Sequence, residues 1–249
     1  MLPEPHPELS ARLDRRCWHY PSTGSTNDDA WRLARAGAPH GSLVLADAQT
    51  AGRGRLGRSW FSPPQHNLYF SLILRPQTTP AQTALATLAA GVAMAEVLGL
   101  RLKWPNDVVD PDFRKVAGLL SEMDVVAGRV AFVVLGVGLN VNQPDFPADL
   151  PLAASLRMLR GHDMDRHALL AQLLPALDHR IQQIEHERPA VIRAWSSLSA
   201  TTGRRVRVGE LEGTALGLRD DGALMLRDDA GQLHHVVAGD VLPLEPHHS

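Results

Sequence analysis

The sequence of 249 residues has a single cysteine, no long hydrophobic segment and no excess of charge of either sign. Because Cys17 stands alone, an intramolecular disulfide framework and a zinc site built from several thiolates are excluded. The N-terminus has no basic segment followed by an apolar one, and no stretch approaches the roughly 20 apolar residues that cross a membrane. With 25 Lys and Arg against 27 Asp and Glu, the chain is no general binder of polyanions. We therefore expect a cytoplasmic protein without membrane contact.

Several motifs of nucleotide and metal sites are missing as well. No Walker A sequence occurs, and the 12 histidines include no H-x-x-x-H pair. The segment Gly52–Gly57 matches G-x-G-x-x-G, but Pro63 and Pro64 prevent the helix that a dinucleotide-binding fold places after it. We predict neither a Rossmann site nor a structural metal, and the sequence leaves any other metal ligands unknown.

Acidic residues are absent from the 48 residues between Asp47 and Glu96, although three arginines lie close together in this stretch. These are Arg53, Arg55 and Arg58, and glycines alternate with them. Guanidinium groups on a glycine-rich loop can surround a phosphate with both side-chain and backbone donors. The pattern favours a site for a small anion, with a solvated basic loop as the alternative.

The hydrophobic pattern predicts an α+β part followed by a part with short alternating strands. Residues 1–20 are expected to form a loose lead with one short helix, and 21–200 a single domain. Near residue 200 the pattern changes from helices to short alternating strands separated by turn residues, so that 201–249 is predicted to be a small β-barrel domain. Helices are expected between Ser25 and Gly37 and at 81–98, 166–187 and 189–198, and strands at 42–46, 67–75, 101–104, 117–126, 129–139, 205–208, 211–218, 223–227 and 234–237.

Three further segments carry candidate chemistry, and each also has an ordinary structural interpretation. Lys103–Asp107 places a cation, an aromatic ring and a carboxylate at the end of a strand, although a turn after a core tryptophan has the same composition. Lys115 precedes an apolar strand and is either a site lysine or a side chain that extends to solvent. Gly136 and Gly138 are either bulge glycines or make room for a flat ligand on the sheet.

Five motifs in one order give these segments a common interpretation. They are Ser25–Asn27, Gln49–Trp60, Lys103–Asp107, Lys115–Gly118 and Gly136–Asn140. Together they resemble the motif series of the biotin protein ligases, over roughly residues 20–245. The resemblance implies a class II synthetase-like α+β catalytic domain, the biotin–lipoate ligase fold with a mixed sheet and packed helices, followed by a small C-terminal SH3-like β-barrel.

The resemblance implies a reaction in two steps. Biotin reacts with ATP to give biotinyl-5′-AMP and diphosphate, and biotin then passes to a lysine of the biotin carboxyl carrier protein of a carboxylase. ATP and biotin are the expected substrates, Mg²⁺ is expected with ATP, and the protein is expected to be a monomer or a homodimer. A lipoate–protein ligase and a non-enzymatic biotin-responsive regulator remain alternatives.

The same resemblance implies roles for individual residues. The implied catalytic residues are Arg53, Arg55, Asp107 and Lys115, of which Lys115 is expected to bridge the biotin carboxylate and the α-phosphate. The implied biotin-binding residues are Ser25, Thr26, Asn27, Gln49, Gly52, Arg53, Gly54, Arg55, Trp60, Lys115, Gly118, Gly136 and Gly138. The implied nucleotide-binding residues are Arg55, Arg58, Trp60, Lys103, Asn106, Lys115 and Asn140.

The sequence departs from the family pattern at both ends. Many members begin with a DNA-binding domain, and the segment before Ser25 is too short to form one, so no DNA partner is expected. The family's C-terminal segment often ends in Gly-Asp/Glu-x-x-x-Arg, with an arginine that approaches the nucleotide. Here Gly239 and Asp240 are followed by Leu244 at that place, which leaves this contact open.

Overall fold

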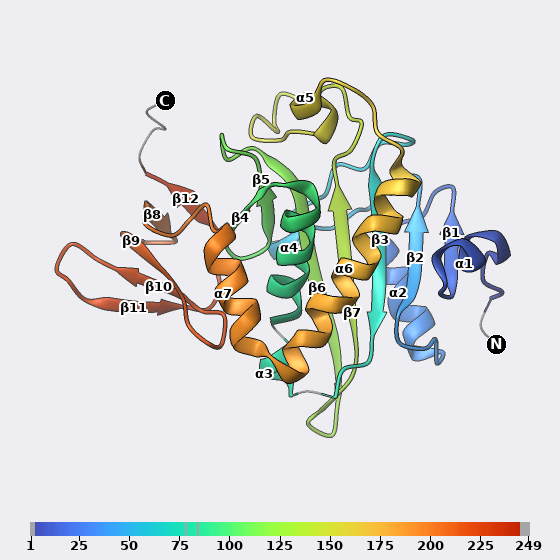
Figure 1. The fold of residues 1–249 in the computed structure, drawn as a ribbon, viewed down its shortest axis with the longest axis horizontal. Helices are drawn as coiled ribbons and strands as arrows, with labels where there is room; N and C mark the ends of the chain where they lie inside the picture. Colours follow the sequence, from blue (N-terminus) through green and yellow to red (C-terminus); the bar gives the residue numbers. More distant parts are fainter. Residues whose placement is uncertain (1–2, 78, 84, 245–249) are drawn as a thin grey trace.

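The computed structural model describes residues 3–77, 79–83 and 85–244, and its strands form two separate sheets (Figure 1). The larger, mixed sheet has seven strands in the order β1-β2-β3-β7-β6-β5-β4, and the smaller, antiparallel sheet has five in the order β11-β10-β9-β8-β12. The strands are β1 Cys17–Tyr20, β2 Ser42–Ala46, β3 Leu68–Leu74, β4 Arg101–Lys103, β5 Asp107–Val109, β6 Lys115–Val126, β7 Arg129–Leu139, β8 Arg205–Val208, β9 Leu211–Leu218, β10 Leu224–Arg227, β11 Leu233–Val236 and β12 Val241–Pro243.

Helices cover both faces of the larger sheet. The α-helices are α1 Pro7–Leu13, α2 Thr26–Arg35, α3 Pro80–Thr83, α4 Leu85–Leu98, α5 Leu156–Arg160, α6 Arg166–His186 and α7 Arg188–Leu198, and a 3₁₀ turn, η1, spans Arg55–Gly57. Figure 1 shows α4, α6 and α7 in front of the sheet and α2 behind it. No helix in the described ranges is both long and apolar enough to span a bilayer.

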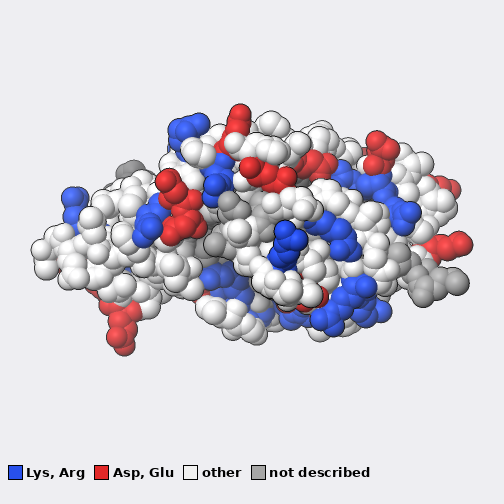
Figure 2. Space-filling view, turned by 90° about the horizontal axis from the view of Figure 1, so that it is seen from below, with Lys and Arg blue, Asp and Glu red and all other residues white. Residues whose placement is uncertain are grey.

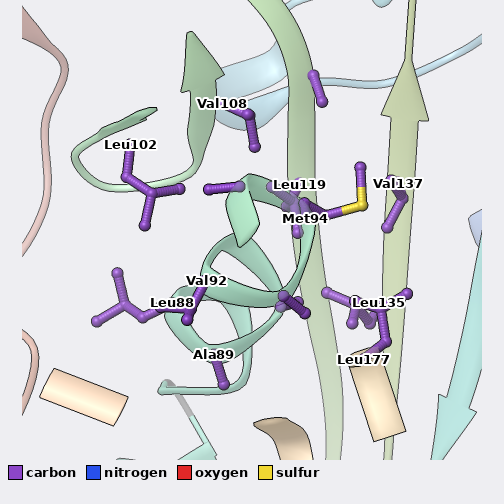
Figure 3. Close-up of a cluster of buried hydrophobic side chains, with 14 of the residues drawn as sticks. Leu88, Ala89, Val92, Met94, Leu102, Val108, Leu119, Leu135, Val137 and Leu177 are labelled. Atoms are coloured by element: carbon purple, nitrogen blue, oxygen red, sulfur yellow. The ribbon is translucent and has the colours of Figure 1, made fainter. Parts of the chain in front are cut away.

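Helix α4 is the centre of the hydrophobic core. Apart from Thr87 and Glu96 it is apolar on all sides, because the sheet lies on one side of it and α6 and α7 lie on the other. Leu88, Val92 and Met94 are fully or almost fully buried near Leu119 of β6 and Leu135 of β7 (Figure 3). Each such side chain contributes about 1.5–3 kcal/mol through burial, so this layer fixes the position of β6 and β7. The predicted helix 81–98 is confirmed as α3 and α4, with Ala84 outside the described residues.

The opposite face of the sheet is shared between α2 and an open region. Strand alternation directs Val133, Leu135 and Val137 of β7 to the α4 side, so that Gly136 and Gly138 face the α2 side. At the far end of the strand the α2 side is filled by a second cluster that includes Val134. The glycine end of β7 therefore leaves free volume on the α2 face.

The smaller sheet packs against the β4–β5 end of the larger one. Trp104 is 2% exposed, and its Nε1 donates a hydrogen bond to the carbonyl of Gly222 at 3.1 Å. The guanidinium of Arg204 lies 4.7 Å from the ring centroid of Phe113. These contacts place the C-terminal residues beside the segment Lys103–Asp107, which the sequence singled out.

Short elements differ most from the sequence-based expectation. In the segment 1–20 the expected short helix is present as α1, but the segment also contributes strand β1, which was not predicted and pairs in parallel with β2 at the edge of the sheet. Strand β5 replaces part of the expected turn after Trp104. Helix α5 and strand β12 were also not predicted. Strands of three or four residues have little local pattern, so their partners in the sheet determine them.

Candidate functional site

A cavity of about 340 Å³ lies on the α2 face of the larger sheet. All residues predicted for the site line this cavity except Gly52. Gly52 is instead enclosed by its neighbours: a Cβ there would come within 2.7 Å of Ser62 Oγ and 2.8 Å of the Trp60 carbonyl oxygen. The five sequence motifs therefore converge on one place from five separate segments.

Glycines make the floor of the cavity. Gly118 of β6 pairs with Gly138 of β7, and Leu120 pairs with Gly136. A Cβ on Gly138 would overlap the Trp60 indole, and a Cβ on Gly118 would lie 2.9 Å from the same ring. The expected room for a flat group on the sheet is present, and in this structure the indole of Trp60 rests there.

One end of the cavity is a buried polar network at the start of α2. Ser25 is the N-cap residue of α2, and the backbone N–H of Thr26 donates to Gln49 Oε1 at 2.9 Å. Gln49 Nε2 donates in turn to Ser62 Oγ at 3.0 Å. Ser71 Oγ, from β3, lies 2.7 Å from Asn27 Oδ1. Hydroxyl and amide groups held in this way suit a compact polar ligand with several hydrogen-bonding atoms.

The other end of the cavity holds two lysines around one carboxylate. Lys115 Nζ lies 2.6 Å from Asp107 Oδ1, and Lys103 Nζ lies 3.0 Å from Asp107 Oδ2. Burial opposes ionisation of Asp107, but Lys115 and Lys103 outweigh it and hold its pKa below the usual value. Asn106 Nδ2 donates to the carbonyl of Leu119 at 2.7 Å and ties this turn to β6. The cluster carries a net positive charge suited to anionic oxygens.

The arginine loop, residues 52–60, is a small hairpin over the cavity. Trp60 N–H donates to the Gly52 carbonyl at 2.8 Å, and Gly54 N–H donates to the Arg58 carbonyl at 2.7 Å. At the tip, Gly57 has φ of +74°, which a glycine adopts without strain. As expected from Pro63 and Pro64, no helix follows the loop: the chain continues without one from Arg58 to β3.

Carboxylates from elsewhere in the chain pair with the loop arginines. Arg53 lies 2.6 Å from Asp28 of α2 and 3.2 Å from Glu122 of β6. Arg58 lies 2.7 Å from Asp240. The acid-free stretch therefore does not leave an unpaired positive loop, because segments distant in the sequence supply the negative charge.

Arg55 connects the loop to two other parts of the site. Its Nη1 donates to Asn106 Oδ1 at 3.3 Å and to the carbonyl of Gly239 at 3.2 Å. Asp240 is 3.7 Å away. Because Gly239 and Asp240 precede β12, the C-terminal sheet holds the loop above the cavity.

Trp60 occupies the centre of the site. Its Nε1 is buried and has no hydrogen-bond partner within the described chain. Lys115 Nζ lies 5.1 Å from the ring centroid, a distance at which a cation and an aromatic face attract. An unpartnered donor beside an ammonium group provides two positive contacts for an acceptor that enters here.

A wall of the cavity that the sequence did not predict comes from Phe146–Ala153. Lys115 N–H donates to the Leu152 carbonyl at 2.6 Å, which fixes this wall to β6. Asn140 lines the cavity, but its Nδ2 donates to the Ala154 carbonyl at 3.0 Å. In this structure the amide nitrogen of Asn140 therefore anchors the wall.

Three polar residues of the site were also missed. Ser71 and Glu122 contact Asn27, and Asp240 contacts the loop arginines. Alternation along β6 could have indicated Glu122, because it lies on the same face as Gly118. Asp240 belongs to the Gly-Asp/Glu-x-x-x-Arg pattern, but the expected contact in that pattern was at the position of Leu244.

A larger cavity of about 560 Å³ lies at the opposite end of the sheet, beside α6. Arg15 in its lining pairs with Asp178 at 2.7 Å, and Arg75 donates to the carbonyls of Ala34 and Ala38. Its charged groups thus serve the fold, and none of the motif residues is there. Figure 2, viewed from below, shows Lys and Arg mixed with Asp and Glu on the visible face.

Comparison with known proteins finds biotin ligases among the relatives of this chain. Residues 20–140 match the Biotin/lipoate A/B protein ligase family, and residues 201–242 match the Biotin protein ligase C terminal domain. The biotin–acetyl-CoA-carboxylase ligase of Mycobacterium tuberculosis is 37% identical over 238 residues, which cover 89% of this chain and 86% of that protein. The ligase of the same name from Paracoccus denitrificans is 37% identical over 227 residues, covering 84% and 93%.

A solved structure agrees with these sequence relatives. The biotin protein ligase from Aquifex aeolicus, in complex with biotin and ATP, superposes with a TM-score of 0.75 at 28% identity. The match covers 91% of this chain and 97% of that chain. It includes both sheets, so the mixed α+β architecture predicted from the motifs is confirmed.

Proposed function

The chain belongs to the biotin/lipoate A/B protein ligase family, among its biotin protein ligases, and we propose that it uses ATP to attach biotin to a lysine of a biotin carboxyl carrier domain. The observation that carries this proposal is the cavity with two chemically different ends. The end at α2 offers hydroxyl and amide groups, and the other end offers Lys115, Lys103 and the arginine loop. Biotin has the matching polarity, with a neutral urea ring at one end and a carboxylate at the other.

In the first step, an oxygen of the biotin carboxylate attacks the α-phosphorus of ATP, and the bond from that phosphorus to the diphosphate oxygen breaks. The reacting groups are both anionic, so positive charge is the main requirement of the site. Lys115 can reach both because it lies at the edge of β6 and directs its ammonium over Gly118. Asp107 orients Lys115 and Lys103 and keeps them close to the reacting oxygens.

In the second step, the amine of the carrier lysine attacks the carbonyl carbon of biotinyl-5′-AMP, and AMP leaves with the bond electrons. The arginine loop and the indole of Trp60 cover the floor of the cavity, so they can shield the anhydride from water until the amine arrives. Arg55 and Arg58 are the loop residues nearest the C-terminal sheet, and we assign them to the phosphate. Arg53, which pairs with Asp28 and Glu122 beside Asn27, is assigned to the biotin end.

Mg²⁺ enters in this proposal together with ATP. Among the described residues, no group of three or more His, Cys, Asp or Glu could hold a metal ion. Phosphate oxygens commonly carry Mg²⁺ with only one or two protein carboxylates, so the ion is treated as part of the nucleotide substrate. No step of the mechanism depends on a metal ligand from the chain.

The proposal also concerns location and assembly. We place the protein in the cytoplasm, with a carrier domain as its protein partner and with no nucleic-acid or membrane partner. Its proposed assembly is a monomer or a homodimer.

Diphosphate release tests the proposal against its two alternatives. Folded protein with ATP and Mg²⁺ should release diphosphate with biotin and much less with lipoate, and it should label one lysine of an added carrier domain. Stronger release with lipoate would indicate a lipoate ligase. No release with either acid, from protein that binds biotin, would indicate a regulator and contradict the proposal. The Lys115→Ala variant is the matched control for contaminating activity.

A further inference from the structure

Glu122 is a carboxylate beside the cavity that no sequence motif included. It lies on β6, four residues after Gly118, and its side chain is 35% exposed. Its Oε2 accepts a hydrogen bond from Asn27 Nδ2 at 2.7 Å and lies 3.2 Å from Arg53 Nη2. Glu122 does not line the cavity, whereas Asn27 and Arg53 both do. Any effect of Glu122 on a ligand therefore passes through these two residues.

The contact with Glu122 determines which way the amide of Asn27 points. An ionised carboxylate only accepts hydrogen bonds, so the group of Asn27 that faces it must be the NH₂. Arg53 pairs with the same carboxylate, with Nη2 3.2 Å from Oε2. At the other end of the amide, Ser71 Oγ lies 2.7 Å from Oδ1, and the same hydroxyl lies 2.9 Å from Thr26 Oγ1. The carboxylate of Glu122 is therefore the partner that determines the orientation of the amide.

In this orientation the carbonyl oxygen of Asn27 lies over the floor glycine Gly136. A Cβ at Gly136 would overlap Oδ1, which places that oxygen directly against β7 inside the cavity. Asn27 is 4% exposed, so a polar ligand atom that meets this oxygen is withdrawn from water. An acceptor in such a place favours a ligand with an N–H donor and gives nothing to one without.

We propose that Glu122 is a positioning residue for substrate choice: it holds Asn27 with its oxygen toward the cavity, so that the site selects a ring with an N–H donor, such as the urea of biotin, over a ring without one, such as the dithiolane of lipoate. The proposal rests on biotin being the substrate. It assigns Glu122 no contact with either substrate. Its effect should therefore appear in the affinity for biotin and depend on the presence of Asn27.

Calorimetric titration of biotin without ATP tests this role. We expect Glu122→Gln to weaken biotin binding about tenfold, because the amide of Asn27 then loses the charged partner that fixes its direction. Asn27→Ala should cause a loss at least as large. The double variant should bind no more weakly than Asn27→Ala alone, since Glu122 acts through Asn27.

Asp28→Asn is the matched control. It also removes one carboxylate partner of Arg53, at 2.6 Å, but no hydrogen bond joins Asp28 to the Asn27 side chain in the structure. We expect its affinity for biotin to stay within about threefold of wild type, the range of an exposed ion pair. An equal loss in Asp28→Asn and Glu122→Gln would show that Glu122 acts through Arg53 and would overturn the proposal.

Other outcomes are equally decisive. Unchanged biotin binding by Glu122→Gln, or losses that multiply in the double variant, would also overturn it. If Glu122→Gln melts at a lower temperature than wild type, Ser71→Ala removes the other partner of the same amide and should weaken biotin binding as well; normal binding by that variant would contradict the proposal. A wild-type chain that binds biotin but releases no diphosphate would contradict only the proposed function.

Discussion

The floor of the cavity and the loop above it are held in different ways. The floor consists of glycines on β6 and β7, fixed by strand pairing and by the core layer of α4 on the opposite face. The loop 52–60 is held by ion pairs with Asp28, Glu122 and Asp240, and these pairs are partly exposed. A ligand cannot replace the backbone hydrogen bonds between strands. A ligand phosphate can, however, replace the carboxylate partner of an arginine.

The floor and the loop therefore control different properties of the site: the floor sets its shape, and the loop sets its charge. The floor determines which molecule fits, because a single Cβ at Gly136 or Gly138 would collide with a neighbouring side chain. The loop provides charges that are already paired in the absence of an anion, so a ligand replaces existing partners. Changes in the floor should therefore act on all ligands. Changes at Arg55 and Arg58 of the loop should act mainly on ligands that carry phosphate.

The largest effect is expected at the border between the two regions, where Lys115 leaves β6. Lys115→Ala should lower the rate of diphosphate release by at least about 100-fold, because the ammonium is placed to contact both reacting anions. Lys103→Ala is the matched control and should cost less, since Lys115 stays paired with Asp107. Activity of Lys115→Ala within threefold of wild type would mean that this lysine only extends to solvent.

A methyl group on the floor should have the next largest effect. Gly138→Ala would drive a Cβ into the indole of Trp60, whereas Gly54→Ala in the loop would meet nothing closer than 3.5 Å. We expect the floor variant to weaken biotin binding by tenfold or more and the loop variant by about threefold at most. Calorimetry with biotin compares them, and equal losses would remove the distinction between floor and loop.

The loop should distinguish the adenylate from biotin. Arg55→Gly removes the side chain that reaches Asn106 and Gly239. Of the two ligands, only the adenylate carries a phosphate that this guanidinium could bind. We expect about tenfold weaker binding of a non-hydrolysable biotinyl-adenylate analogue and little change for biotin. The variant should also release biotinyl-5′-AMP, which would then label bystander lysines. If both ligands lost the same affinity, Arg55 would not read the phosphate.

A smaller effect is expected from the C-terminal side of the loop. Asp240→Asn frees Arg58 and weakens the hold on Arg55, so that the KM for ATP should change by no more than about threefold, the range of an exposed pair. The difference from wild type should shrink as salt is raised, because screening weakens the pair in the parent protein. A difference that is independent of salt would point to packing rather than charge.

The smallest effect concerns stability in acid. Lys115 and Lys103 hold the pKa of Asp107 below its usual value of 3.8 against the effect of burial. A carboxyl group with a lowered pKa stabilises the fold above its unfolded pKa, and this contribution is lost as the pH falls through the folded value. The advantage of wild type over Asp107→Asn in free energy of unfolding should thus narrow below about pH 4. An advantage that is constant down to pH 2 would contradict this ion pairing.

Elements with a strong local pattern could be predicted from the sequence. The strands 42–46 and 129–139 agree with β2 and β7, because long buried strands carry their own apolar pattern. Between the predicted strands 117–126 and 129–139 the chain makes a tight turn, with positive φ at Ala127 and Gly128. Short elements such as β1 and β5 could not be predicted, since three or four residues carry little pattern of their own and the neighbouring strands determine them.

The site divides in the same way. Residues inside the motifs were found because each motif is a local combination of glycine, cation and aromatic residues. Ser71 and Asp240 were missed because their importance depends on which side chain they contact, and no local spacing expresses that. For Glu122, the alternation along β6 was the one local signal. The roles of the individual motif residues stay predictions, and the variants above test them.

The salt bridge between Arg58 and Asp240 has a consequence for how the two sheets communicate. An anion that attracts Arg58 must compete with Asp240, and in doing so it removes one of the contacts that join the C-terminal sheet to the loop. Linked equilibria are reciprocal, so any partner that binds the C-terminal sheet and displaces Asp240 alters the affinity for nucleotide by the same factor. Asp240 thus couples nucleotide binding at the cavity to binding events on the C-terminal sheet.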